Sequence, residues 1–223
     1  MLDRYEEQLQ ELYKLLETLG NSIIDAANEA ENGVNTLTCK NFDNAKEALK
    51  NTENCANDID QNILKTFALF EPEAVELREL VAYLKITSEL VRLSDNIKGF
   101  SKRMKNHIKS EVDFTTLQEY SIHLAKSAFS SIDFAIDSLH VKDKEETTNL
   151  YRKVCVEESK TDDLYSILEK NIMADLCKDI ENSAQSIEIL STMRKLERMA
   201  DRAVNINKLM LFARRGGEIK HFG

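Results

Sequence analysis

The sequence predicts an all-α fold of two tandem, pseudo-symmetric three-helix bundles, built from six long antiparallel helices. Three observations lead to this prediction. The chain of 223 residues has one proline and six glycines, too few for a strand-rich fold, which needs a turn about every 8–12 residues. Apolar residues recur every three or four positions, which is the helical period. The second half of the chain also repeats the pattern of the first.

The first half is expected to form three helices. The first covers residues 2–33, and the second covers 42–67 as one continuous amphipathic stretch. The third begins at Pro72, since proline is tolerated in the first turn of a helix, and extends over 72–109. Each of these segments carries a single apolar stripe, so each is expected to bury one face against the other two.

Each helix of the second half is expected to begin at an aspartate, because a carboxylate caps the free N–H groups of a first turn. The three expected N-caps are Asp113, Asp143 and Asp179. Glu146 stands three residues after Asp143, as in a capping box. The helices continue to residues 139, 172 and 209, and Gly216 and Gly217 stop the last one.

The two halves are interpreted as an internal duplication. Arg92 and Asp95 of the first half recur at a constant offset as Arg198 and Asp201. Connections between the helices are short, so sequential neighbours should run antiparallel. The predicted boundaries are 1–110 for the first repeat, 111–217 for the second repeat and 218–223 for a tail.

The composition excludes several classes of function. A net charge of −9 argues against non-specific nucleic-acid binding, which requires a basic surface. The N-terminus is charged from the start, and no apolar run approaches the length of a membrane span, so a cytoplasmic protein is expected. Four scattered cysteines without a C-x-x-C pattern indicate reduced thiols rather than a disulfide or zinc site.

Two pairs of acidic residues in the second half have the spacing of metal ligands. Glu158 and Asp162 form one pair, and Glu197 and Asp201 form the other. A spacing of four places both carboxylates on one helix face. Chance alone gives roughly seven such pairs in this composition, but these two lie at the edges of apolar stripes, where an unpaired carboxylate is unfavourable. A salt bridge to Arg198 is the alternative explanation for the second pair.

Recognisable catalytic motifs are absent from the sequence. The four histidines lie on different segments, and the paired E-x-x-H helices of di-iron bundles are missing. Neither a P-loop, a dinucleotide fingerprint nor a G-x-S-x-G elbow occurs. The chain is therefore expected not to be an enzyme, and a carboxylate-bridged metalloenzyme is the less favoured alternative.

Two segments resemble a known family. LERMADRAVNI, residues 196–206, closely resembles the L-E-R-I-G-D-x-A-x-N-I signature of the PhoU family of phosphate-uptake regulators. PEAVELR, residues 72–78, resembles that family's P-x-A-x-D-L-R pattern, with Glu76 in place of the aspartate. The N-terminal segment and the plan of two three-helix repeats are also similar, so the resemblance covers nearly the whole chain.

The resemblance implies a non-enzymatic, cytoplasmic negative regulator of phosphate uptake and phosphate-starvation signalling. Its expected partners are the ATPase subunit of a phosphate ABC transporter and a sensor histidine kinase, with membrane contact only through them. A homodimer is also expected. The alternative is a helical accessory protein of another phosphate or cation transporter that has no kinase partner.

The resemblance also implies metal binding through E/D-x-x-x-D motifs, with iron, zinc, manganese or magnesium as the ion. The second-half ligands that match this pattern are Glu158, Asp162, Glu197 and Asp201. In the first half Val91 stands where the acid should be and only Asp95 remains. The positions equivalent to Glu158 and Asp162 are Thr52 and Ala56.

Because valine coordinates no metal, the first-half site is expected to be lost or weakened, with Asp95 as its remaining candidate ligand. A shifted register that uses Glu53, Asp58 and Asp60 would restore it in part.

Overall fold

The structure is a computed structural model that describes residues 2–110, 118–176 and 183–216. In this part of the chain all regular structure is helical, which confirms the all-α prediction. The helices are α1 (Leu2–Thr36), α2 (Cys39–Ala48), α3 (Thr52–Phe70), α4 (Ala74–Lys109), α5 (Gln118–His140), α6 (Lys144–Leu176) and α7 (Ser183–Arg215).

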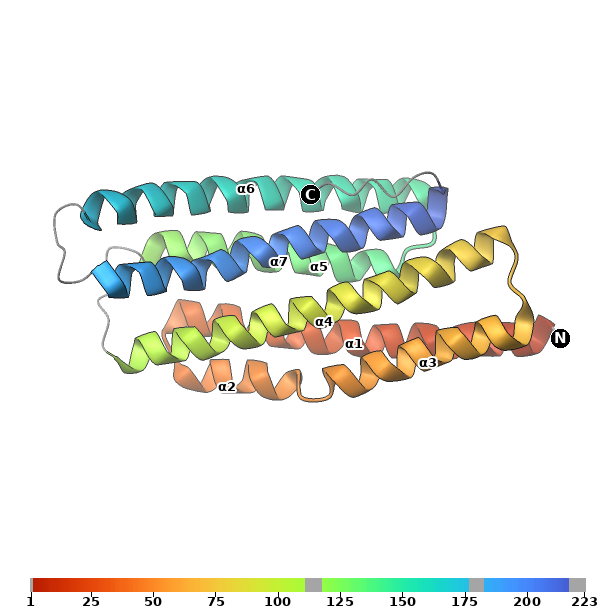
Figure 1. Cartoon of the computed structure of the whole chain (residues 1–223). Helices are drawn as coiled ribbons and strands as arrows, with labels where there is room; N and C mark the ends of the chain where they lie inside the picture. Colours follow the sequence, from red (N-terminus) through yellow and green to blue (C-terminus); the bar gives the residue numbers. More distant parts are fainter. Residues whose placement is uncertain (1, 111–117, 177–182, 217–223) are drawn as a thin grey trace.

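The helices pack as two elongated bundles that lie side by side (Figure 1). In the first bundle α1, the α2–α3 pair and α4 contact one another; in the second, α5, α6 and α7 do so. Successive helices run antiparallel, apart from α2 and α3, which follow one another in the same direction (Figure 1). Contacts of α4 with α7 and of α1 with α5 join the two bundles along their length.

The expected second helix is interrupted. It consists of α2 and α3, separated at residues 49–51. Leu49 is fully buried at the break, and the Thr52 hydroxyl donates a hydrogen bond to the Leu49 carbonyl over 2.9 Å. Apolar spacing of three and four continues through the break, so the periodicity gave no sign of it.

The N-terminus of α4 differs slightly from the prediction. Pro72 lies one residue before the N-cap, which is Glu73. Glu73 and Glu76 form a capping box, in which each side chain accepts a hydrogen bond from the other residue's backbone N–H. The proline ends the preceding turn instead of opening the helix, because Glu71 before it adopts a left-handed conformation at the end of α3.

Two of the predicted helix boundaries in the second half are confirmed. Asp143 caps α6, since one of its carboxylate oxygens accepts backbone hydrogen bonds from Glu145 and Glu146 at 2.7 and 2.8 Å. Gly216, with φ of 74°, ends α7 in the left-handed conformation that glycine adopts without strain. The proposed caps Asp113 and Asp179 lie outside the described residues, as does Gly217.

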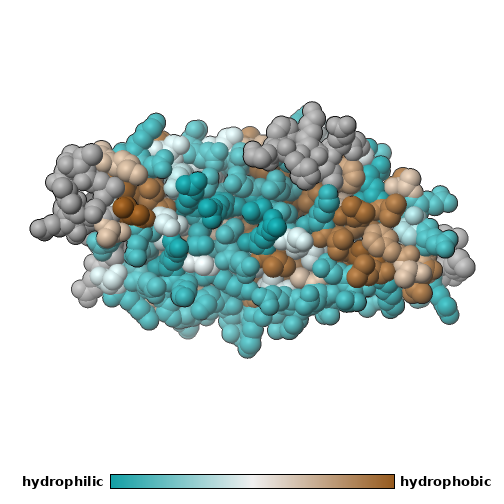
Figure 2. All heavy atoms as spheres, in the orientation of Figure 1, coloured by the Kyte–Doolittle hydropathy of each residue, from teal (hydrophilic) through white to brown (hydrophobic). Residues whose placement is uncertain are grey.

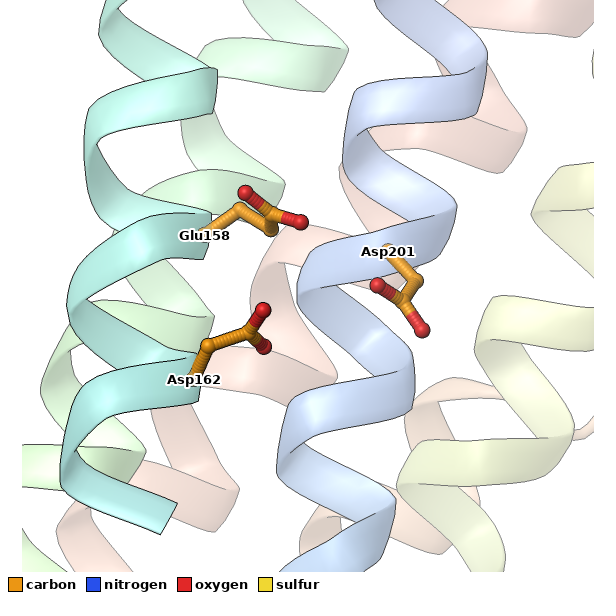
Figure 3. Close-up of side chains that lie close together, drawn as sticks. All are labelled: Glu158, Asp162 and Asp201. Atoms are coloured by element: carbon orange, nitrogen blue, oxygen red, sulfur yellow. The ribbon is translucent and has the colours of Figure 1, made fainter. Parts of the chain in front are cut away.

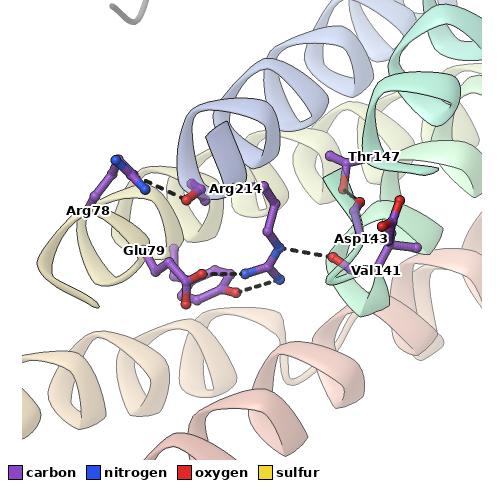
Figure 4. Close-up of polar contacts among 8 residues, drawn as sticks. Arg78, Glu79, Val141, Asp143, Thr147 and Arg214 are labelled. Carbon is purple, nitrogen blue, oxygen red and sulfur yellow. Dashed lines mark hydrogen bonds and ion pairs between the residues drawn. The ribbon is translucent and has the colours of Figure 1, made fainter. Parts of the chain in front are cut away.

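A buried cluster at the end of α7 ties the two bundles together (Figure 4). Arg214 is only 8% exposed. Its guanidinium donates to Glu79 Oε1 over 2.7 Å and to the Tyr83 hydroxyl over 3.1 Å, both on α4. Its Nε donates to the carbonyl of Val141, between α5 and α6. Beside it, Arg78 donates to the carbonyl of Ala213 over 3.2 Å.

The predicted division into repeats at 110 and 111 remains a prediction. Residues 111–117, which contain the boundary, and the predicted tail 218–223 lie outside the described residues. The helices on either side of the boundary, α4 and α5, belong to different bundles (Figure 1).

Candidate metal centre

The candidate site lies on the surface between α6 and α7. Both helices are fixed by apolar side chains that point into the second bundle, Val154 and Leu168 on α6 and Leu196 and Met199 on α7, all fully buried. Because side chains three and four positions apart share a helix face, this packing determines which residues remain at the seam. The acidic residues of both motifs lie there.

Three carboxylates from two helices meet at this seam. Glu158 and Asp162 extend from α6 toward Asp201 on α7 (Figure 3). One oxygen of each lies within 4.8 Å of the others. Glu158 is half-buried, whereas Asp162 and Asp201 are exposed. This group of three is called the acidic seam below.

Glu197 lies one turn before Asp201 on α7, next to the acidic seam. Its side chain is 23% exposed. Its Oε2 has no solvent exposure and accepts no hydrogen bond from a described residue. Arg194 Nε lies 3.9 Å from that oxygen, beyond hydrogen-bonding range. A buried acceptor in this state is stabilised by any cation that enters the seam.

The electrostatics of the seam favour a cation. Burial is the largest cause that raises the pKa of Glu158, followed by repulsion from Asp162 and Asp201. The pKa of Asp162 is likewise raised by burial and then by Asp201. Burial and Asp201 raise the pKa of Glu197 as well. The carboxylates thus repel one another when ionised, and a bound cation would remove that repulsion.

Basic residues nearby offset part of this repulsion. Burial raises the pKa of Asp201, while Arg202, Lys208 and Arg198 lower it. Arg202 pairs with Glu89 on α4 over 3.0 Å, so its guanidinium is oriented toward the first bundle. The alternative of a salt bridge from Arg198 is not seen among the described residues; it is Arg194 that approaches the Glu197 carboxylate, at 3.9 Å. Sequence reasoning missed the role of Arg202, since its partner lies on a distant helix.

The donor set fits a hard divalent cation. Carboxylate oxygens are the ligands that Mg²⁺, Ca²⁺ and Mn²⁺ prefer, and they also bind iron and zinc. Glu158, Asp162 and Asp201 would hold the ion, whereas Glu197 is not part of the converging group. A cation bound there would link α6 to α7.

Asp95 does not join the acidic seam. It lies on α4, its side chain is 62% exposed, and it pairs with Lys98 over 3.7 Å. The two first-half positions equivalent to Glu158 and Asp162 are Thr52 and Ala56, both buried. Among the described residues of the first bundle, no group of three ligand side chains converges. The loss of the first-half site stays a prediction.

Glu53, Asp58 and Asp60, the residues of a shifted register, all lie on α3. Of these three residues, Asp60 is the one with a buried carboxylate oxygen, because its Oδ1 is inaccessible to solvent. This oxygen accepts no hydrogen bond from a described residue. Burial raises the pKa of Asp60. None of the three belongs to a convergent group within the described chain.

Known proteins resemble this chain in sequence and in fold. Residues 122–210 match the family model of the PhoU domain. The phosphate-specific transport system accessory protein PhoU homolog of Aquifex aeolicus is 26% identical, covering 99% of this chain and 94% of the relative. The crystal structure of PhoU from Pseudomonas aeruginosa has a TM-score of 0.85 at 19% identity, covering 96% of this chain and 100% of that chain. The resemblance to the PhoU family is confirmed.

A second PhoU structure, the phosphate transport system regulatory protein from Streptococcus pneumoniae, has a TM-score of 0.79 at 19% identity over 96% of this chain. The PhoU domain match begins in α5 and ends in α7. It therefore contains the acidic seam and Glu197. Among the described helices, none is both long and apolar enough to cross a bilayer.

Proposed function

We propose that this chain is an accessory protein of phosphate transport, which restrains phosphate uptake and phosphate-starvation signalling through protein contacts. The observation that carries the proposal is the likeness to PhoU proteins along nearly the whole chain, including a relative named for the phosphate-specific transport system. The proposed partners are the ATPase subunit of a phosphate ABC transporter and a sensor histidine kinase. The chain would act in the cytoplasm and would catalyse no reaction.

Exposed apolar side chains support a role in protein contact. Figure 2 shows an apolar area at the end of the molecule where the α3–α4 turn and the end of α7 lie in Figure 1. Leu69, Val75 and Leu77, which flank the α3–α4 turn, are 58%, 57% and 44% exposed. Exposed apolar clusters of this kind are typical of protein interaction sites.

A decisive experiment uses cells that carry the phosphate transporter and lack this chain. Loss of the chain should raise phosphate uptake and expression of phosphate-starvation genes at high phosphate, and the wild-type gene should reverse both. Affinity purification of the tagged chain should recover the transporter ATPase and the kinase. Recovery of a different transporter without any kinase would support the alternative accessory role and contradict the present proposal.

We further propose that Glu158, Asp162, Glu197 and Asp201 bind iron, zinc, manganese or magnesium. The support is the convergence of three carboxylates within 4.8 Å and the nearby buried Glu197 oxygen, which accepts no hydrogen bond from a described residue. Elemental analysis should find metal in the wild-type protein and a strongly reduced content in the double variant Glu158→Gln/Asp201→Asn. Asp95→Asn is the matched control, because it removes one carboxylate outside the acidic seam. Equal metal in all three proteins would refute the site.

The proposed oligomer is a homodimer. Light scattering of the purified chain measures its mass directly, against 25.5 kDa for one copy. A mass of one copy across a wide concentration range would contradict the dimer.

A further inference from the structure

A basic pocket lies on the other side of α7 from the acidic residues, where the two repeats meet. It is formed by the C-terminal half of α4 and the N-terminal half of α7, at the left of Figure 1, and its volume is about 540 Å³. The charged residues of its lining are Lys102, Arg103, Glu188 and Lys195. Among the described lining residues three cations thus face one carboxylate, in a chain whose net charge is −9.

Arg103 is held in place across the pocket. Its Nη1 donates a hydrogen bond to Ser191 Oγ on α7 over 2.6 Å. Its other guanidinium N–H groups have no partner among the described residues. Ser191 uses its oxygen as the acceptor, so its own O–H stays available to donate. A fixed guanidinium beside a free hydroxyl matches the oxygens of a tetrahedral anion.

Lys195 crosses from α7 to lie against the backbone of α4. A methyl group at Gly99 would come within 2.8 Å of Lys195 Nζ, so the ammonium occupies the space that a side chain there would fill. Lys195 makes no ion pair with any described residue. Burial lowers the pKa of Lys195, followed by repulsion from Arg103 and Arg198, and Asp95 opposes the effect. The cations are therefore close enough to repel one another.

The inner wall of the pocket contains two buried polar side chains that contact each other. His107 and Thr192 are buried, and His107 Nε2 lies 2.9 Å from Thr192 Oγ1. The Thr192 hydroxyl donates its hydrogen to the Glu188 carbonyl over 2.8 Å. It must therefore accept from His107, which places the imidazole proton on Nε2. Burial is the largest cause that lowers the pKa of His107, while Glu188 opposes the shift. Glu188 is the one carboxylate among the described residues of the lining.

We propose that this pocket binds a phosphoryl group, as inorganic phosphate or as part of a small phosphate ester. Arg103, Lys195 and Lys102 supply the positive charge, and Ser191 supplies a neutral donor. The anion would remove the repulsion among the cations and connect α4 of the first repeat to α7 of the second. The volume exceeds that of phosphate alone and lies in the range of small-molecule sites. This binding does not depend on the proposed contacts with a transporter or a kinase.

Isothermal titration calorimetry on the full chain tests the proposal, with inorganic phosphate and a nucleoside monophosphate as separate probes and succinate as the carboxylate control. All titrations follow chelator treatment, so that a metal at the acidic seam contributes nothing. We expect binding of at least one phosphate probe and much weaker binding of succinate. The tighter of the two probes identifies the free anion or the ester as the ligand. Failure of both phosphate probes to bind would overturn the proposal.

Three variants locate the site. Lys195→Gln and Arg103→Gln should each weaken phosphate binding about tenfold or more, since each removes a charge-assisted hydrogen bond. Lys50→Gln, which removes the same charge from a side chain that is 68% exposed near the α2–α3 break, should bind as wild type does. Equal binding by all of these variants would place the anion elsewhere and overturn the assignment.

Gly99→Ala tests whether the position of the Lys195 ammonium matters for binding when its charge is unchanged. The added methyl group should displace the Lys195 ammonium and weaken binding, although every charge is retained. Thermal stability should not fall, because alanine favours a helix interior by about 1 kcal/mol over glycine. Binding by Gly99→Ala that equals that of the wild type would show that the position of the Lys195 ammonium does not matter and would overturn its assignment.

Discussion

Asp133 on α5 is a carboxylate with a strongly raised pKa. Burial raises its pKa from 3.8 to about 6, and repulsion from Asp137 and from Glu31 on α1 adds to the shift. The folded state therefore holds a proton that the unfolded chain releases. Stability falls as the pH rises from about 4 to about 6, and the loss persists above that range.

Asp133→Asn should consequently stabilise the protein at neutral and alkaline pH. We expect its melting temperature to exceed that of the wild type by about 3 °C at pH 8 and by clearly less at pH 4.5. Circular dichroism melts at both pH values measure this. Asp25→Asn changes an exposed aspartate of α1 and serves as the control. A pH-independent difference would mean that Asp133 titrates at its ordinary pKa.

Asp201→Asn should raise the melting temperature of the metal-free protein but remove the stabilisation that a bound metal gives. In metal-free protein at pH 7, Asp201→Asn relieves repulsion on Glu158, Asp162 and Glu197, so the melting temperature should rise by about 1–3 °C. Added Mn²⁺ should raise the melting temperature of the wild type but leave that of the variant nearly unchanged. Asp95→Asn should keep the wild-type response to metal. A full response in Asp201→Asn would exclude this carboxylate as a ligand.

Sequence reasoning identified the acids of the seam but not their geometry. The spacing of four placed Glu158 with Asp162 and Glu197 with Asp201 on common helix faces. Only the packing of α6 against α7 brings Asp201 to the first pair and leaves Glu197 at the edge, where one oxygen is buried. The rotation of each helix about its axis is set by its core contacts, which a linear pattern does not specify.

At the scale of elements, the close approach of α1 and α2 depends on Gly33. A methyl group there would lie within 2.7–2.9 Å of three carbon atoms of the Phe42 ring. Phe42 is fully buried and packs edge-to-face with Phe100 of α4. A larger residue at position 33 would therefore force the Phe42 ring or α2 to shift.

Gly33→Ala should therefore destabilise the protein by about 1–3 kcal/mol, despite the better helix propensity of alanine. Urea unfolding followed by circular dichroism measures the change. Gly99→Ala is the matched control, because the methyl group there meets only the flexible end of Lys195. Equal stability of the two variants would show that α2 shifts freely against α1.

The break between α2 and α3 illustrates the limit of periodicity. A three-residue interruption keeps Phe42, Leu49 and Ala56 on the buried face, so the apolar stripe is the same with or without it. Asn51, at the N-cap of α3, was the available local signal, since asparagine favours helix ends over helix interiors. The signal is weak when it occurs inside a strongly amphipathic stretch.

At the scale of the molecule, Arg214 joins both bundles. It bonds Glu79 and Tyr83 of the first and the backbone at Val141 of the second. Arg214→Ala would leave a half-buried carboxylate and a buried hydroxyl without their partner. We expect the free energy of unfolding to fall by about 2–4 kcal/mol.

Arg214→Lys should recover only part of this loss, because an ammonium lacks the planar fork that reaches three acceptors. Arg215→Ala removes a neighbouring exposed arginine and should change stability by less than about 0.5 kcal/mol. Denaturant titrations of the three variants provide the comparison. Equal effects of Arg214→Ala and Arg215→Ala would show that the network does not stabilise the joined bundles.

The sequence by itself determined the helical class, the approximate helix boundaries and the resemblance to the PhoU family. These properties follow from local periodicity, capping residues and a short signature, all of which are encoded in neighbouring positions. Tertiary structure alone decided that α4 packs on α7, which of the acids converge, and that Arg103 and Lys195 share a pocket next to Gly99. Those contacts join residues far apart in the chain, and they depend on how each helix is rotated and offset against its neighbours.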